Sequence, residues 1–297
     1  MKSVIIKLFI GIVLFFALDF LAGIVIGHFY ATSDNINLRD ANYGFLGDAE
    51  NDILILGASE LSHALITNKI ADETGLATYN LACDACGIYY QYPLLKTVLE
   101  RHAPKAIILS SNQMNEEDLR YVSKLYPFYR KNKHVKQMVD TLYPKEFLKL
   151  ALQGYVFNSN FIRIFDSKDD NLNGYVPLPP EESTLQNIKI DVLPHGRNYE
   201  LSDMTVSYFK ALIRMANAAG TKVYVCIPPA PEVINKSYWN KMKAVVADTG
   251  AELIDLSHDD SMIYDGKYFY DKTHLNHDGA EVMTDKVLEV LKTDGVY

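Results

Sequence analysis

Short apolar runs that alternate with longer amphipathic stretches constrain the fold of this chain most strongly. Runs that are apolar along their length are typical of strands buried on both faces of a parallel sheet. Their alternation with helices predicts an α/β fold, a three-layer α/β/α sandwich around a mostly parallel five-stranded sheet. The predicted strands are Asp52–Leu56, Thr78–Ala82, Ala106–Ser110, Lys222–Ile227 and Glu252–Leu256, and the predicted helices are Leu61–Glu73, Ile88–Arg101, Asp203–Ala219, Tyr238–Thr249 and Asp278–Leu291.

The chain begins with a long apolar segment. Val4 to Ile26 carries charge only at Lys7 and Asp19, and its length is close to the ~20 residues that cross a bilayer as a helix. Lys2 and Lys7 stand at its start, and lysine there favours the cytoplasmic side. We therefore predict an N-terminal transmembrane helix, a single-pass anchor in the cytoplasmic (inner) membrane. The main domain would be extracytoplasmic, in the periplasm or at the cell surface.

A cleaved signal peptide is the competing interpretation of this segment. The apolar region of a signal peptide is usually shorter, at ~7–15 residues, and ends at a small-x-small cleavage site. No convincing site follows Ile26, and no cysteine for lipid attachment lies nearby. Asp19 is costly inside lipid, so it would either contact another membrane protein or lie where water reaches it.

These features divide the chain into a transmembrane anchor (1–27), a polar stalk (28–50) and a main domain (51–297). An insertion at about 113–201, rich in Tyr, Phe, Lys and Asn, separates the third and fourth predicted strands. Connections of this length are usually functional or separately folded. Because this one begins at a strand end, it would roof the site there. Within it, the proline-stiffened Gly174–Pro180 would line a substrate groove or form a surface strap.

Charge and cysteine content exclude some functions. The net charge of -8 and the lack of a long Lys/Arg tract argue against nucleic acid as a partner. Cys83 and Cys86 form a C-x-x-C motif without the second pair or matching histidines of a zinc site. They are either small buried residues, a redox pair or, outside the cytoplasm, a local disulfide.

Ser59 follows the first predicted strand, directly after Gly57 and Ala58. Ligands of parallel α/β sheets bind beyond the carboxyl ends of the strands, so this hydroxyl would be presented at the sheet edge. Free N–H groups at the start of the next helix would stabilise an oxyanion. The alternative role of Ser59 is that of an ordinary helix N-cap.

Asp271 and His274 lie in a loop between the last predicted strand and the last predicted helix. An imidazole titrates near neutral pH and can take a serine proton. An aspartate three residues earlier can orient the ring and stabilise its protonated form. His277 and Asp278 are nearby alternatives, but the Asp-x-x-His spacing favours Asp271 and His274.

Two further residues fit an oxyanion hole. Gly87 follows the second predicted strand and starts a helix, where its N–H is unhindered. Asn112 follows the third predicted strand, and its amide side chain would donate a further hydrogen bond.

The order Ser59, Gly87, Asn112, then Asp271 and His274 resembles the SGNH (GDSL-type) hydrolase superfamily. The resemblance implies a flavodoxin-like sandwich in which Ser59 is the nucleophile, Asp271 and His274 complete the triad, and Ser59, Gly87 and Asn112 form the oxyanion hole. It spans 52–291, interrupted by the insertion. The first block here reads Gly-Ala-Ser rather than Gly-Asp-Ser, and the third reads Ser-Ser-Asn-Gln rather than Gly-x-Asn-Asp.

The nucleophile segment Gly57–Leu61 is also similar to that of DltD-type proteins, which are membrane-anchored and work in D-alanylation of cell-envelope polymers. We therefore expect a membrane-anchored serine esterase or O-acyltransferase acting on O-acyl groups, in the first place acetyl, of cell-envelope or secreted polysaccharide. This chemistry needs no metal or organic cofactor. The alternative is a non-catalytic assembly protein that partners a membrane-bound O-acyltransferase.

Overall fold

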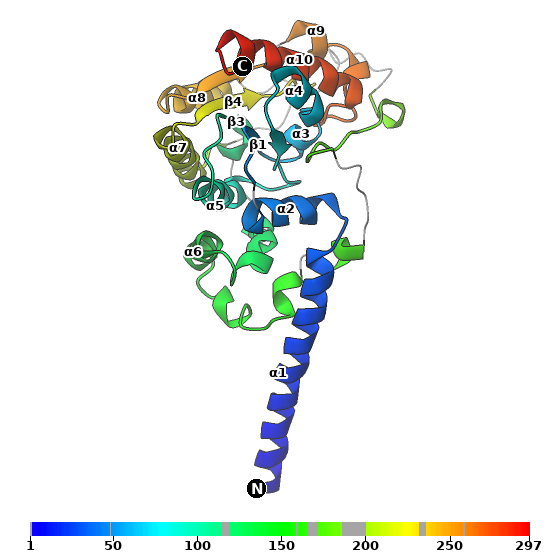
Figure 1. The fold of residues 1–297 in the computed structure, drawn as a ribbon, viewed down its shortest axis with the longest axis vertical. Helices are drawn as coiled ribbons and strands as arrows, with labels where there is room; N and C mark the ends of the chain where they lie inside the picture. The colour runs from blue at the N-terminus through cyan, green and yellow to red at the C-terminus, as the bar shows by residue number, and fades with distance from the viewer. Residues whose placement is uncertain are drawn as a thin grey trace. The chain divides into compact units, whose positions relative to one another are not determined.

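The computed structural model describes residues 2–47, 49–114, 119–158, 160–165, 172–185, 200–231, 236–257 and 259–297. The chain forms two compact units (Figure 1). The first comprises Met1–Gly47 and Leu119–Asp169, and the second comprises Asp48–Asp118 and Asp170–Tyr297. The predicted insertion is therefore divided between the two units.

A parallel sheet lies at the centre of the second unit and confirms the predicted α/β fold. In the described residues its five strands follow the order β2-β1-β3-β4-β5, and every neighbouring pair is parallel. The strands are β1 Ile53–Leu56, β2 Thr78–Asn80, β3 Ala106–Ser110, β4 Lys222–Ile227 and β5 Glu252–Asp255. Because β2 and β3 flank β1, the loops that follow these two strands lie on either side of the β1 carboxyl end.

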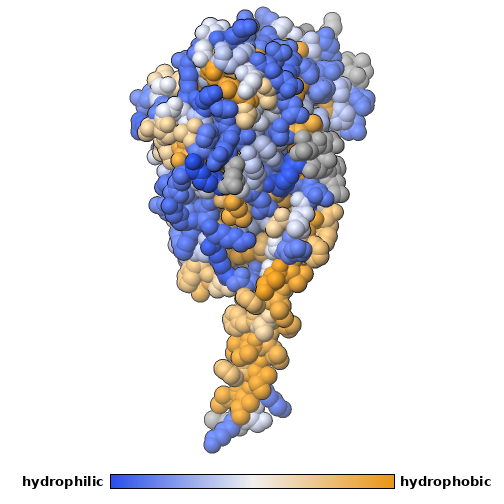
Figure 2. Space-filling view, in the orientation of Figure 1, coloured by the Kyte–Doolittle hydropathy of each residue, from blue (hydrophilic) through white to orange (hydrophobic). Residues whose placement is uncertain are grey.

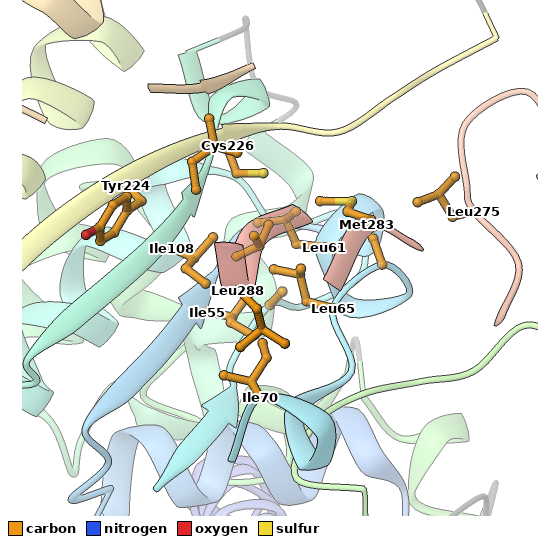
Figure 3. Packing of buried hydrophobic residues seen from close by; sticks show 14 of the residues in the cluster. Ile55, Leu61, Leu65, Ile70, Ile108, Tyr224, Cys226, Leu275, Met283 and Leu288 are labelled. Atoms are coloured by element: carbon orange, nitrogen blue, oxygen red, sulfur yellow. The ribbon is translucent and has the colours of Figure 1, made fainter. Parts of the chain in front are cut away.

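Helices cover both faces of this sheet (Figure 1). On one face Leu61 and Leu65 pack with Met283 and Leu288 against strand residues such as Ile55 (Figure 3). On the other face α5 packs against α7. The helices of this unit are α3 Ser59–Ser62, α4 Thr67–Thr74, α5 Ile88–Leu99, α7 Asp203–Ala218, α8 Lys236–Ala247, α9 Asp260–Ile263 and α10 His277–Thr293, with 3₁₀ turns η1 Ser111–Met114, η6 Pro180–Glu182 and η8 Gly266–Tyr268.

The single helix predicted over Leu61–Glu73 is wrong, because two helices, α3 and α4, share this stretch. Between them the chain makes tertiary rather than helical hydrogen bonds. The His63 ring bonds to the Val176 carbonyl at 2.7 Å, and the Ile66 N–H donates to Thr284 Oγ1 at 3.1 Å. Hydrogen bonds to residues far away in the sequence, Val176 and Thr284, thus determine where the predicted helix is interrupted.

The proline-stiffened segment Gly174–Pro180, which we call the strap, ties two loops of the second unit together. The Val176 N–H donates to the Ser62 carbonyl at 2.9 Å, and the His277 N–H donates to the Leu178 carbonyl at 2.8 Å. Tyr175 is buried. The strap therefore joins the end of α3 to the start of α10.

Replacing Gly174 by alanine is expected to destabilise the protein by roughly 3 kcal/mol. Gly174 has φ +83°, and a Cβ at this position would lie 1.8 Å from the Asn80 carbonyl oxygen. Gly75→Ala is the matched control, because Gly75 has φ +68° with no heavy atom within 4 Å and should cost only about 1 kcal/mol. Thermal unfolding of the full chain in detergent measures both. Equal melting temperatures for the two variants would contradict the close packing of the strap on β2.

Two N-terminal helices begin the first unit, α1 Lys2–Ala31 and α2 Ile36–Leu46. The segment predicted as a polar stalk, 28–50, thus holds the end of α1 and the whole of α2. Leu38, Ala41 and Phe45 are buried, and their spacing places them on one face of a helix. Packing of this face explains why the segment folds as a helix.

The rest of the first unit comes from the insertion and packs on these helices. Its elements are η2 Leu119–Phe128, α6 Lys133–Leu142, η3 Glu146–Leu148, η4 Tyr155–Phe157 and η5 Ile162–Phe165. Tyr30 of α1 is buried, with ring centroids 6.0 Å from Phe128 and 5.3 Å from Phe157. Phe45 of α2 stacks near Phe128 at 4.6 Å. Aromatic contacts thus join α1, α2 and the insertion in one core.

Asp19 has a partner that neither sequence-based interpretation anticipates. Its carboxylate accepts the N–H of Gln153 at 2.6 Å and the N–H of Gly154 at 3.0 Å. These groups precede η4, so a single carboxylate satisfies two backbone donors of the insertion. The negative charge of Asp19 is therefore stabilised by hydrogen bonds within this unit.

Candidate active site

Ser59, His274 and Asp271 are brought together in the second unit. Ser59 Oγ lies 2.8 Å from His274 Nε2. His274 Nδ1 lies 3.0 Å from Asp271 Oδ2 and 3.1 Å from Oδ1. Two segments 215 positions apart thus form one continuous hydrogen-bonded chain, with the order of groups found in a serine triad.

The Asp271 carboxylate fixes which nitrogen of His274 carries the proton. A carboxylate only accepts hydrogen bonds, so Nδ1 must donate, and Nε2 of the neutral ring then accepts from the Ser59 hydroxyl. Burial raises the pKa of Asp271, but hydrogen bonds from the His274 ring and from the N–H groups of Thr273 and His274 outweigh it and hold that pKa below its usual value. Asp271 is therefore ionised at neutral pH.

A short loop with two buried ends carries His274. The Tyr270 N–H donates to the His274 carbonyl at 2.9 Å. Phe269 and Leu275 form an antiparallel bridge on either side, and both are buried in the core. The ring is thus held over the sheet edge by packing on both flanks.

The alternatives in this loop have other partners. His277 Nδ1 lies 2.9 Å from the Tyr175 hydroxyl, and its Nε2 lies 3.8 Å from Glu281. Asp278 is exposed in the first turn of α10. His274 is, among the described histidines, the one within hydrogen-bonding distance of Ser59, so the geometry favours the Asp271–His274 pair.

Ser59 lies at the turn from β1 into α3. Hydrogen bonds to Gly57, two residues earlier, fix this turn. The Gly57 carbonyl accepts the side-chain amide of Gln91 at 2.6 Å and the N–H of Cys83 at 3.0 Å. Gln91 is completely buried on α5. Ala58, at the N-cap of α3, makes no side-chain hydrogen bond to the first turn. The turn is thus fixed on its buried side by Gln91, while Ser59 itself is half-buried at the sheet edge.

A buried polar pair connects this turn to the end of β3. Ser110 Oγ donates to the carboxylate of Glu60, and both residues are buried. The Asn112 N–H donates in turn to Ser110 Oγ at 3.2 Å. Glu60 therefore sets the position of η1, which carries Asn112, relative to the neighbouring Ser59.

A second histidine stands beside His274. The rings of His63 and His274 meet edge to face, with centroids 5.2 Å apart. Burial lowers the pKa of His63, although the bond to the Val176 carbonyl and the charge of Asp84 act against this. A neutral His63 adds no second positive charge when His274 takes a proton.

Gly87 and Asn112 lie in the loops that flank β1. Gly87 is the N-cap of α5, and its carbonyl accepts the N–H groups of Tyr90 and Gln91 at 3.0 and 3.1 Å. Asn112 belongs to η1 and is half-buried. Both residues follow strands that flank β1, at the sheet edge where Ser59 lies. Their roles as oxyanion donors, like the catalytic roles of the triad, stay predictions.

The C-x-x-C pair forms a turn in the same region. Cys83 and Cys86 are buried cysteines, and the Cys86 N–H donates to the Cys83 carbonyl at 2.9 Å. Of the three interpretations of this pair, small buried residues near a strand end describes this arrangement.

Four buried polar residues at this site were missed by sequence reasoning: Glu60, His63, Gln91 and Ser110. Ser110 had a usable signal, because it is a polar residue at the end of an apolar strand, whereas Glu60 lies four positions beyond a strand end in α3. Gln91 sits in a predicted amphipathic helix, and His63 finds its partner more than a hundred positions away. Neither of these has a local signal.

No family model matches this sequence, and no curated protein matches it. Among solved structures it is similar to a psychrotrophic esterase, EstA, from Pseudoalteromonas sp. inhibited by monoethylphosphonate, at 12% identity, 82% coverage of this chain, 97% of that chain and a TM-score of 0.38.

Two further solved structures are similar at 10% identity, each covering 89% of this chain. One is a Streptococcus pneumonia protein assigned as a platelet activating factor, with 92% of its length covered and a TM-score of 0.45. The other is a Bacteroides fragilis protein assigned as an acylhydrolase, with 97% covered and a TM-score of 0.43. Because these TM-scores lie below 0.5, we base the function on the geometry of the site.

Proposed function

We propose that this chain is a membrane-anchored serine esterase or O-acyltransferase of the SGNH type, acting through an acyl-enzyme on Ser59. The observation that carries the proposal is the unbroken contact of Ser59 Oγ, His274 and Asp271 at 2.8 and 3.0 Å. A structural N-cap serine would need no such base. A base held in one tautomer beside a hydroxyl is what nucleophilic catalysis needs.

In the first half-reaction Ser59 Oγ attacks the carbonyl carbon of an ester while its proton passes to His274 Nε2. The tetrahedral intermediate collapses, the ester C–O bond breaks, and the alcohol leaves with the proton from His274. Water or a sugar hydroxyl then gives its proton to His274 and attacks the acyl carbon. The bond from that carbon to Ser59 Oγ breaks, and His274 Nε2 returns the proton to Ser59 Oγ. Asp271 stays ionised throughout and stabilises the protonated ring.

The oxyanion would be stabilised by the Ser59 N–H, the Gly87 N–H and the Asn112 side chain. The position of these groups at strand ends on either side of β1 supports this assignment. One such donor is worth about 3 kcal/mol of transition-state stabilisation.

The anchor role of α1 is supported by its length and composition and by its contacts. In the described residues α1 is the helix that is long and apolar enough to cross a membrane. The carboxyl-terminal half of α1, which we call its distal part, packs in the first unit through Asp19 and the buried Tyr30. Removal of a signal peptide would take away part of a folded core, so we propose that α1 is retained.

The substrate class follows from the proposed location outside the cytoplasm. O-acyl groups on cell-envelope or secreted polysaccharide, with acetyl as the expected group, are the esters that an anchored extracytoplasmic domain would meet. The similarity of Gly57–Leu61 to the nucleophile motif of DltD-type proteins supports an envelope polymer. Hydrolysis and transfer use the same residues and differ in the acceptor alone.

A fluorophosphonate probe tests the nucleophile. We expect covalent labelling of the full chain in detergent, its loss in Ser59→Ala, and its retention in Ser62→Ala. Ser62 is a matched control, because its hydroxyl lies in the same helix but is buried and donates to the Ser59 carbonyl. An unlabelled wild-type protein would favour the non-catalytic accessory role beside a membrane-bound O-acyltransferase.

Acetylated oligosaccharide then distinguishes esterase from transferase. The full chain is incubated with this substrate, with and without an acceptor sugar, and free acetate and acetylated acceptor are quantified. Acetylated acceptor formed at the expense of free acetate identifies a transferase. Acetate release that is unaffected by the acceptor identifies an esterase.

A further inference from the structure

Within the first unit, the insertion contacts the distal part of α1 at several positions. Asp19 binds the Gln153 and Gly154 N–H groups. At Gly23 a Cβ would lie 2.3 Å from Gln153 Cβ, so a glycine is needed for the insertion to approach the helix this closely. Further along, the Phe29 and Phe165 rings lie 6.4 Å apart. The insertion therefore packs along α1 from residue 19 to residue 30.

The contacts at Asp19 and Gly23 fall within the stretch of α1 that lipid would cover. With a rise of 1.5 Å per residue, Asp19 lies about 18 Å along the helix from Lys7, whereas a hydrocarbon layer is about 30 Å thick. If Lys7 marks the near boundary of this layer, Asp19 and Gly23 lie inside it. Chain that touches both residues must then reach the lipid as well.

The outer surface of that chain is apolar to a degree unusual for a water-exposed surface. Leu148 is 68% exposed, Ile162 84% and Phe165 68%, and Phe147 and Phe161 are also exposed. We call residues 146–158 and 160–165 the apolar segment. In Figure 2 the hydrophobic surface of α1 continues onto the neighbouring surface at its distal end.

The insertion part of this unit also has a charge opposite to that of the whole protein. Leu119–Asp169 contains ten Lys and Arg against four Asp and Glu, a net charge of +6, in a chain with a total of -8. Exposed apolar side chains next to basic ones are typical of protein surfaces that enter the interface of anionic membranes.

A pocket between α1 and the insertion combines the same two properties. It has a volume of about 220 Å³ and is lined on the α1 side by Ile24 and Gly27, and on the insertion side by Arg130, Lys131 and Val156, among others. The Arg130 guanidinium donates from one nitrogen to the Leu150 and Ala151 carbonyls at 2.6 and 2.7 Å, which fixes the position of this cation beside Lys131. A lining of two cations and apolar side chains fits the headgroup phosphate and the upper acyl chain of a phospholipid.

We propose that the apolar segment is embedded in the headgroup and upper acyl region of the leaflet at the distal end of α1, with anionic phospholipid headgroups against Arg130 and Lys131. This inference rests on the proposed anchoring of α1. The unit would thus be bound to the membrane through two elements, a spanning helix and an interfacial segment. The hydrogen bonds of Asp19 would connect these two elements inside the lipid.

Depth-dependent quenching of a fluorophore tests the proposal. Single-cysteine additions at Leu14, Ile162 and Gln137 are labelled with an NBD fluorophore in the full chain, with the unmodified protein measuring background from the buried native thiols. The proteins are reconstituted in phosphatidylcholine–phosphatidylglycerol vesicles, with and without nitroxide-labelled lipid. Position 14 reports the anchor, position 162 the apolar segment, and the exposed position 137 on α6 serves as the control.

We expect nitroxide lipid to lower the emission at positions 14 and 162 by roughly twofold or more, and to leave position 137 unchanged. Quenching at 14 without quenching at 162 would overturn this proposal while leaving the anchor intact, and would point to a protein partner for the exposed apolar side chains. No quenching at 14 would overturn the anchor itself. Loss of the quenching at 162 in pure phosphatidylcholine supports the anionic headgroup, and unchanged quenching contradicts it.

Discussion

Ser59→Ala and His274→Ala are each expected to lower kcat for ester hydrolysis by about 10⁴- to 10⁶-fold, and the double variant is expected to lose no more than either single one. Without His274 the Ser59 hydroxyl has no base, and without Ser59 the base has no nucleophile to activate. The 2.8 Å contact between Ser59 Oγ and His274 Nε2 makes the two groups one functional unit.

Hydrolysis of an activated acetyl ester by the full chain in detergent measures these losses. Ser62→Ala is expected to keep most of the activity, since its hydroxyl faces the Ser59 carbonyl and Asp84 rather than His274. Additive losses in the double variant would show that Ser59 and His274 act separately, and the triad mechanism would then be wrong.

Much of the second unit could be predicted from the sequence, because its signals are local. The strands at 106–110 and 222–227 have the predicted bounds, and the other three differ by one or two residues at an end. A strand buried on both faces must be apolar throughout, so a short window of sequence is enough to find it. The proximity of Ser59 to Asp271 and His274 was also predictable, since the loops that follow parallel strands lie at one sheet edge.

The features that could not be predicted depend on partners far away in the chain. His63 ends α3 and contacts a carbonyl 113 positions later. Asp19 pairs with backbone groups 134 and 135 positions later. No periodicity or spacing near either residue reports such a partner, because the partner is set by how the units fold.

The division of the insertion has the same cause. Residues 119–169 pack with the N-terminal helices, whereas the strap packs on loops next to Ser59 and His274. Both parts lie between the third and fourth predicted strands, so the strand pattern indicated one insertion. The contacts divide it into two parts with different surroundings.

Asp271→Asn is expected to lower kcat by up to about 10⁴-fold while leaving the fold intact. Asparagine can still accept the N–H groups of Thr273 and His274 through its carbonyl oxygen, as Asp271 does at 2.7 and 2.8 Å. Its amide cannot stabilise an imidazolium, and with the amide turned toward Nδ1 it favours the tautomer with the proton on Nε2. His274 would then no longer accept the Ser59 proton. Asp278→Asn is the matched control, since Asp278 is exposed in the same region.

The same variant has a pH-dependent effect on stability that identifies the role of the charge. The pKa of Asp271 is held below its usual value in the fold, so the unfolded chain binds the proton more tightly. The stability contributed by the ionised carboxylate is therefore complete above about pH 3.9, the ordinary value for Asp, and is lost as pH falls through the lower pKa of the folded state. We expect the melting temperature of Asp271→Asn to lie below that of the wild type at pH 7, and this gap to narrow at pH values below about 3.9. If the difference in melting temperature stayed constant with pH, the hydrogen bonds of Asp271 would not stabilise its ionised form specifically.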